Sequence, residues 1–135
     1  WCMSASKKNV LRGLHLQTKK TQEKFLSVVK GKILDVVVDL RHKSKTFGKH
    51  FKMIISAKKA NSILIPAGFA HGFLSLEKEN IVLYSNNNYR SQKSEIGLLW
   101  NDKDLNIKWP KSKLIISKKD KSNITFANYL KKYKN

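Results

Sequence analysis

The sequence has one cysteine, two prolines, six glycines, few acidic residues and no long apolar run. A single cysteine excludes an internal disulfide, and it is not enough to form a cysteine-ligated zinc site. The apolar runs extend over a few residues, far short of the ~20 that a membrane-spanning helix needs. We therefore expect one domain around one core, with no membrane partner and in the reducing cytoplasm.

Positive charge dominates the composition, with 28 Lys and Arg residues against 9 Asp and Glu residues, a net charge of +19. Such a field attracts nucleic acid, anionic membranes or phosphorylated ligands. However, 25 of the 28 cations are lysine, whereas nucleic-acid sites use arginine as well. We interpret the charge as a solvated basic surface that also attracts a diphosphate-bearing ligand, and we expect no nucleic-acid partner.

Short stretches of alternating hydrophobicity predict strands over residues 25–29, 33–41, 51–56, 62–65, 72–76 and 81–85. The clearest of them is 33–41, because one of its two faces is apolar throughout. One of its faces carries apolar side chains: Leu34, Val36, Val38 and Leu40. The other carries a mixed set: Ile33, Asp35, Val37, Asp39 and Arg41. Short antiparallel strands at this spacing indicate an all-β sandwich or barrel.

The pattern changes after Pro110. Beyond it, Phe126, Leu130 and Tyr133 recur at i, i+4 and i+7, which predicts a short C-terminal helix, with Ser122 as its N-cap.

Several motifs follow one another along the chain. They are VLRGLHLQ (10–17), GKILDVVVDLR (31–41), SKTFG (44–48), ILIPAGFAHGFLSL (63–76), then Tyr84 and Tyr89, SEIGLLWND (94–102), LNIKWP (105–110) and ISKKD (116–120). In this order they resemble the dTDP-4-dehydrorhamnose 3,5-epimerases, from residue 4 to residue 120. The resemblance implies a cupin-type jelly-roll β-barrel, a homodimer, and catalysis without a metal or an organic cofactor.

The resemblance also implies an N-terminal segment that does not precede Trp1 here. We expect residues 1–135 to be a single cupin-type epimerase domain lacking that segment.

The activity implied by the resemblance is epimerisation at C3 and C5 of dTDP-4-keto-6-deoxy-glucose. The product is dTDP-4-dehydrorhamnose, a precursor for cell-surface polysaccharide. Leu16 stands where the family usually has an aromatic residue, so the identity of the sugar stays open. The alternatives are a 3-epimerase or related cupin isomerase acting on another nucleotide 4-keto sugar, or a non-catalytic basic binding module.

Inverting a carbon beside a ketone needs a base, a stabiliser for the enolate oxygen, and an acid on the far side. The resemblance assigns His15 as the base and Asp120 as its partner. It assigns Tyr84 as the acid and Lys24 as the oxyanion stabiliser. From the residues alone, His15 is equally a hydrogen-bonded histidine in a barrel wall. Asp120 lies among lysines, which indicates a surface loop residue. Tyr84 could equally be an aromatic residue that fills space at the end of a strand, and Lys24 is one of 25 lysines.

The resemblance implies six substrate-binding residues: Arg12, Gln17, His71, Tyr89, Lys119 and Ser4. Strict alternation puts Arg12 on the opposite face from His15, so we predict a β-bulge at Gly13. His71 follows the turn at 66–68 and is, from the residues alone, either a turn residue or a ligand.

No metal site is expected. His15, His42, His50 and His71 lack the clustered spacing of cupin metal ligands. We read Asp35 and Asp39 as structural, with Asp39 pairing with Arg41.

Overall fold

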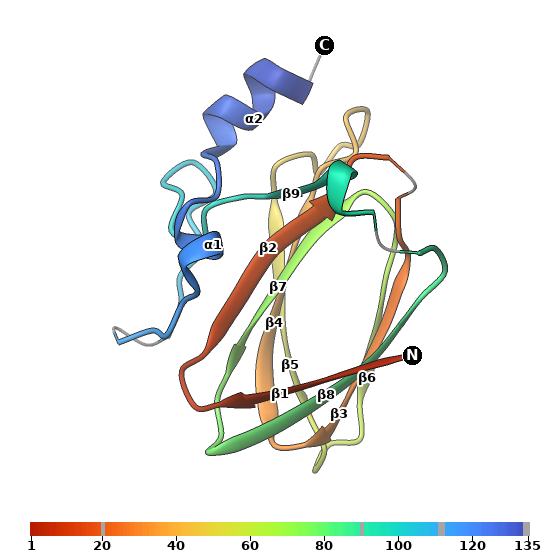
Figure 1. Ribbon diagram of the computed structural model, residues 1–135, viewed down its shortest axis with the longest axis vertical. Helices are drawn as coiled ribbons and strands as arrows, with labels where there is room; N and C mark the ends of the chain where they lie inside the picture. The colour runs from red at the N-terminus through yellow and green to blue at the C-terminus, as the bar shows by residue number, and fades with distance from the viewer. Residues whose placement is uncertain (20, 90, 111–112, 134–135) are drawn as a thin grey trace.

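The computed structural model describes residues 1–19, 21–89, 91–110 and 113–133 and consists mainly of two antiparallel sheets. The first sheet has the order β1-β8-β3-β6 and the second the order β5-β4-β7-β2-β9. Figure 1 shows the sheets wrapped into a barrel, with the helices outside it. The strands are β1 (Cys2–Lys7), β2 (Leu11–Gln17), β3 (Lys24–Lys30), β4 (Lys32–Asp39), β5 (His50–Ser56), β6 (Ser62–Ile65), β7 (Phe69–Ser75), β8 (Glu79–Asn86) and β9 (Glu95–Gly97).

Alternation along each strand separates two cores. Between the sheets lies a cluster to which both contribute: Leu26, Val28, Ile33, Ile55, Phe73 and Val82. The outer face of the five-stranded sheet carries the larger cluster, which includes the even-numbered residues Leu34, Val36, Val38 and Leu40. The predicted division of strand 33–41 into two faces is confirmed.

The C-terminal segment covers that outer face. It holds α1 (Lys118–Lys121) and α2 (Phe126–Tyr133), and Tyr129 of α2 is buried in the outer cluster. A 3₁₀ turn (Gln92–Ser94) precedes β9. The predicted helix exists, but its predicted cap is wrong. Ser122 ends α1, whereas the Oγ1 of Thr125 accepts the N–H of Asn128 and caps α2.

Two predicted strand boundaries are also wrong. Strand β7 begins at Phe69, not at residue 72, so His71 lies inside a strand and is not a turn residue. Strand β4 ends at Asp39, before Arg41. The reason is local: the carboxylate of Asp39 accepts the backbone N–H of Arg41 at 3.0 Å, which turns the chain out of the ladder.

Asp39 anchors the loop after β4. Its buried carboxylate accepts hydrogen bonds from the Arg41 guanidinium at 3.0 Å and from the Ser44 hydroxyl at 2.6 Å, and Thr46 adds another. Burial raises the pKa of Asp39, but these hydrogen bonds outweigh it and hold the pKa well below its usual range. The predicted Asp39–Arg41 pair is confirmed.

Asp39→Asn is expected to cost about 3 kcal/mol of unfolding free energy at pH 7, because the buried carboxylate that accepts from Arg41, Ser44 and Thr46 loses its charge. The pKa of Asp39 is lower in the folded protein than in the unfolded chain, where it is about 3.9, so ionised Asp39 stabilises the fold at pH values above 3.9. This stabilisation is lost as the pH falls from the unfolded pKa through the folded-state pKa of Asp39. Urea unfolding at pH 7 and pH 3 measures both effects. Asp104→Asn, at an exposed aspartate, is the control. An equal pH dependence in Asp39→Asn and wild type would contradict this account.

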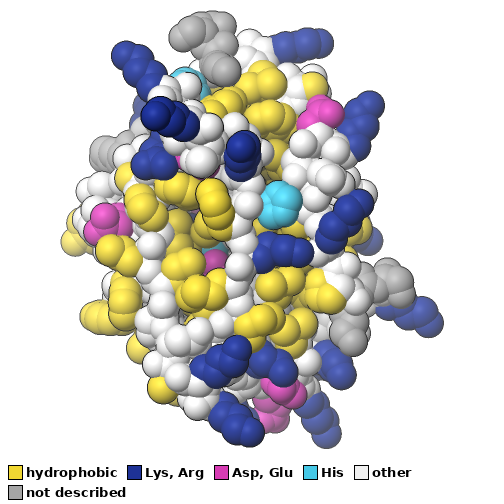
Figure 2. All heavy atoms as spheres, turned by 180° about the vertical axis from the view of Figure 1, so that it is seen from behind, with side chains coloured by type: hydrophobic (Ala, Val, Ile, Leu, Met, Phe, Trp, Pro, Cys, Tyr) yellow, Lys and Arg dark blue, Asp and Glu magenta, His cyan; other side chains and the backbone are white. Residues whose placement is uncertain are grey.

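Basic side chains are spread over the surface. In Figure 2 the Lys and Arg side chains project mostly around the edge of the face shown, and hydrophobic patches lie between them. Within the described residues, no helix has both the length and the apolar character to cross a bilayer.

Candidate active site

Strand β2 brings the candidate base to the inner wall of the barrel. Leu14 and Leu16 belong to the outer cluster, while His15 and Gln17 line a pocket between the sheets. Arg12 pairs with Phe73 and His15 with His71, so β2 holds one residue more than β7 over this stretch. The predicted bulge is therefore confirmed, and it places Arg12 and His15 on the same face.

Gly13 makes this bulge possible. Its φ of +114° disfavours residues with a side chain. A Cβ at this position would also lie 2.6 Å from the Cα of Gly72 and 2.7 Å from the carbonyl oxygen of His71. The close approach of β2 to β7 beside His15 thus depends on glycine.

His15 and Asp120 form a hydrogen-bonded pair. Nε2 of His15 lies 2.7 Å from Oδ1 of Asp120, although 105 positions separate them in the chain. Asp120 is buried, and its other carboxylate oxygen accepts the N–H of Gly13 at 3.2 Å. The sequence-only reading of Asp120 as a surface loop residue is wrong, because Ser117 caps α1 and directs Asp120 inward.

The environment of Asp120 favours its ionised form. Burial raises the pKa of Asp120. His15 lowers it through its hydrogen bond and its charge, and the hydrogen bonds from Gly13 and Asn123 lower it further. These contacts outweigh burial, so the pKa lies below its ordinary value. An ionised carboxylate can only accept, so Nε2 of His15 carries the hydrogen. Nδ1 is then the ring nitrogen able to take a proton.

Tyr84 and Lys24 lie on the facing sheet. Lys24 begins β3, and Tyr84 lies in β8, where it pairs with Leu26 of β3. Leu26 points into the core between the sheets, and Tyr84 packs against that same cluster, so Tyr84 shares the inner face. The structure therefore places the candidate base and the candidate acid on opposite walls of the barrel.

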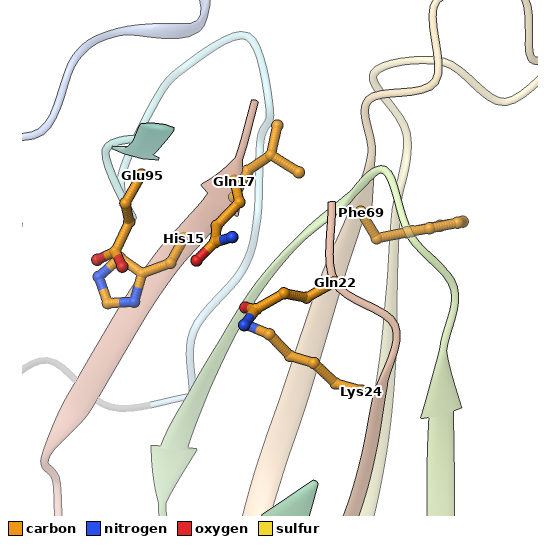
Figure 3. Close-up of a pocket in the computed structure, with 7 residues that line it drawn as sticks. His15, Gln17, Gln22, Lys24, Phe69 and Glu95 are labelled. Carbon is orange, nitrogen blue, oxygen red and sulfur yellow. The ribbon is translucent and has the colours of Figure 1, made fainter. Parts of the chain in front are cut away.

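The pocket collects side chains from both walls. Figure 3 shows His15 and Gln17 of β2 and Glu95 of β9 across an opening from Gln22 and Lys24. Phe69 of β7 lies at one side of it. Gln22, Phe69 and Glu95 are three pocket residues that no motif of the sequence marks as functional. The SEIG motif contains Glu95, but neither charge nor spacing shows that this residue turns inward.

The predicted binding residues have different positions. Gln17 lines the pocket, and its Oε1 accepts the N–H of Ser91 at 2.9 Å. Nζ of Lys119 lies 3.2 Å from Glu95, at the pocket edge. Ser4 lies in β1 opposite Val82, on the inner face. The guanidinium of Arg12 donates to the Ser6 hydroxyl at 3.3 Å.

Two predicted binding residues stand apart from the pocket. Tyr89 is 95% exposed after β8, and the structure does not bring it to the pocket. His71 is buried beside Asp35, with Nε2 2.6 Å from Oδ2.

Among the described residues, no group of three or more His, Cys, Asp or Glu side chains could hold a metal ion. The site itself offers four acid and base groups: an ionised carboxylate, a histidine, a phenol and a lysine amine.

Comparison with known proteins identifies the family. The family model described as dTDP-4-dehydrorhamnose 3,5-epimerase matches residues 2–128. The chain belongs to the dTDP-4-dehydrorhamnose 3,5-epimerase family. A curated member from Shigella flexneri is 45% identical over 118 residues, which cover 87% of this chain and 65% of that protein.

Two solved structures of dTDP-sugar epimerases show the same fold. The dTDP-6-deoxy-D-glucose-3,5-epimerase from Legionella pneumophila, in complex with dTDP-4-keto-L-rhamnose, is 38% identical. Its TM-score is 0.89, and the match covers 92% of this chain and 66% of that one. ChmJ, a 3'-monoepimerase from Streptomyces bikiniensis in complex with dTDP-quinovose, is 30% identical, with a TM-score of 0.90 and coverages of 96% and 67%. The predicted cupin-type jelly-roll fold is confirmed.

The match covers only part of the curated relatives. It spans 65%, 61% and 38% of the length of three curated members of the family.

Proposed function

We propose that this chain inverts C3 and C5 of dTDP-4-keto-6-deoxy-glucose and so forms dTDP-4-dehydrorhamnose for cell-surface polysaccharide. One observation carries the proposal: a carboxylate-bound histidine lines a pocket together with a lysine from the facing sheet, and a tyrosine lies on the inner face of that same sheet. Inversion requires deprotonation on one face of a carbon and protonation on the other, and the two walls offer those groups.

The first half of the reaction belongs to His15. Its Nδ1 removes the hydrogen from a carbon beside the C4 ketone, and the electron pair of the broken C–H bond moves onto the C4 oxygen. The resulting imidazolium lies 2.7 Å from the ionised Asp120, which stabilises it and holds the ring in place. Lys24 lines the same pocket, and its ammonium group stabilises the charge on the enolate oxygen.

The second half belongs to Tyr84. The hydroxyl of a phenol is a proton donor that can hand its proton to the carbanion face of an enolate. Delivered from the facing sheet, the proton arrives opposite to the side from which His15 removed one. The ketone re-forms and the centre is inverted. Solvent then returns a proton to Tyr84 and takes one from His15.

Substrate binding draws on the basic character of the site. We assign Arg12, Lys119 and Ser4 to the nucleotide diphosphate and Gln17 to the sugar. His71 and Tyr89 stand apart from the pocket, so no contact is assigned to them. The net charge of +19 raises the local concentration of a diphosphate anion. No metal or cofactor takes part in the proposed chemistry.

The experiment is a product analysis. The purified chain is given dTDP-4-keto-6-deoxy-glucose, and the ring proton couplings of the product are read by NMR. Inversion at C3 and C5 supports the proposal. Inversion at C3 alone assigns the chain to the second candidate, a 3-epimerase, which the structural likeness to ChmJ favours. Unchanged sugar contradicts both and leaves a binding module.

We also propose a homodimer that forms through the outer face of the four-stranded sheet. While the C-terminal segment covers the other sheet, this face leaves apolar side chains 41–65% exposed: Met3, Phe25, Val29 and Leu64. Their positions follow from the strand pairing, because Phe25 pairs with Leu64, and Met3 shares its face through Leu83. An exposed apolar patch of this kind is typical of an interface.

Leu64→Glu is expected to convert the dimer to monomer, since the charge would be buried against the second copy. Sedimentation of the variant and of wild type measures the change. Phe51→Glu is the matched control, because Phe51 is 49% exposed but lies in β5 of the other sheet. A dimer that persists in Leu64→Glu, or a monomeric wild type, would refute this interface.

A further inference from the structure

Gln22 lines the pocket together with Lys24, and the proposed reaction gives it no role. It lies two positions before Lys24 in the chain, and both side chains enter the same opening. In Figure 3 the amide end of Gln22 is turned toward His15 and Gln17 on the other side of that opening. A neutral amide group therefore shares the pocket wall with the ammonium group that is assigned to the C4 oxygen.

The segment that carries Gln22 is tied to the chain that follows β8. The backbone N–H of Glu23 donates to Oδ1 of Asn87 at 2.9 Å, and the N–H of Asn87 donates back to the carbonyl oxygen of Glu23 at 3.2 Å. Nδ2 of Asn88 donates to the carbonyl oxygen of Thr21 at 2.9 Å. These hydrogen bonds anchor the backbone on both sides of Gln22.

One further contact orients the amide group of Gln22. Its Nε2 donates to the backbone carbonyl oxygen of Asn88 at 2.9 Å. A carbonyl oxygen can only accept, so the amide nitrogen faces Asn88 and Oε1 takes the other side of the amide group. Within the described residues, Oε1 of Gln22 accepts no hydrogen bond. The pocket thus contains an oriented hydrogen-bond acceptor that a ligand can use.

The position of Lys24 indicates which group of the sugar this acceptor meets. Lys24 is assigned to the C4 oxygen, so Gln22 lies beside one of the two carbons that flank C4. C5 carries the ring oxygen and a methyl group, and neither of them can donate a hydrogen bond. C3 carries a hydroxyl group, which can. The acceptor beside Lys24 therefore matches the C3 hydroxyl.

We propose that Gln22 is a specificity-determining residue, whose Oε1 accepts a hydrogen bond from the C3 hydroxyl of the bound sugar. The chain then selects nucleotide-linked 4-keto sugars with a hydroxyl at C3 over their 3-deoxy counterparts. An acceptor that is already oriented binds this hydroxyl with little loss of side-chain freedom, whereas a 3-deoxy sugar leaves it without a partner. This inference deepens the proposed function and rests on it for the placement of the ketone at Lys24.

The experiment compares ligands that differ by one hydroxyl group. dTDP-quinovose has no ketone and so binds without reacting, and its 3-deoxy and 2-deoxy analogues each lack one hydroxyl. Calorimetry gives the three affinities for wild type and for Gln22→Met, which keeps the length of the side chain but not its amide. Wild type is expected to bind the 3-deoxy analogue about tenfold more weakly than dTDP-quinovose, and Gln22→Met to distinguish them by no more than about twofold. The 2-deoxy analogue should lose the same factor in both proteins.

Two kinds of result would overturn the proposal. One is a wild type that binds dTDP-quinovose and the 3-deoxy analogue equally well. This comparison needs wild type alone, so it decides even where Gln22→Met fails to fold. The other is a Gln22→Met protein that keeps the tenfold discrimination at C3, or that loses discrimination at C2 instead.

Gln92→Met is the matched control. Gln92 is exposed in the 3₁₀ turn and lies outside the residues that line the pocket, so this variant should keep the wild-type affinities for all three ligands. The affinities are independent of turnover. A chain that discriminates as expected but does not epimerise would therefore refute the proposed function, whereas an active chain with equal affinities would refute the role of Gln22.

Discussion

His15→Ala is expected to slow deuterium uptake into dTDP-4-keto-6-deoxy-glucose by about 10³-fold at both C3 and C5. The pocket then lacks its base, and the ionised Asp120, buried behind the ring, cannot reach the sugar from its place in α1. Affinity for dTDP-quinovose should change far less, because His15 is assigned to proton transfer and not to binding. The measurement is the NMR intensity of the C3 and C5 protons in heavy water.

The control for this variant is His50→Ala, which removes a histidine in edge strand β5, outside the residues that line the pocket. It should exchange at the wild-type rate. Near-normal exchange by a folded His15→Ala protein would remove His15 as the base, whatever the outcome for His50.

Tyr84→Phe is expected to separate exchange from inversion. His15 still removes the hydrogen in this variant and can return a deuteron to the same face, so label enters the sugar. The far face lacks its acid, however, and inversion should slow by about 10²-fold or more. Time courses of label uptake and of product stereochemistry on the same sample measure the two processes separately.

Tyr133→Phe provides the matched loss of a phenol, since Tyr133 packs against Tyr129 in α2 on the outside of the barrel. It should leave both time courses unchanged. If Tyr84→Phe lost exchange, inversion and dTDP-quinovose binding together, Tyr84 would be a structural aromatic of the inner core and not the acid.

Much of the barrel wall was predictable because strand alternation is a local signal. The two faces of β4 follow from its residues, and so does the bulge at Gly13, since only an extra residue could bring Arg12 and His15 to one face. The cap of α2 was not predictable in the same way. Ser122 and Thr125 both suit an N-cap, and the choice is fixed by Asp102, which accepts the N–H of Phe126 at 2.7 Å from a distant part of the chain.

The candidate site depends on contacts that alternation does not encode. Asp120 reaches His15 across 105 positions because a single helical turn, capped by Ser117, faces the barrel. Its sequence context of lysines pointed to the surface instead. Glu95 and Phe69 enter the pocket through the short strand β9 and the early start of β7, and neither boundary was readable from residue type.

The most direct test of the proposed chemistry is deuterium incorporation by the unaltered chain, with dTDP-4-keto-6-deoxy-glucose in heavy water followed by NMR. Deuterium is expected to replace hydrogen at both C3 and C5, the two carbons that flank the C4 ketone, while C1 and C2 keep their hydrogens. A folded protein that binds dTDP-quinovose but leaves C3 and C5 fully protonated would contradict it.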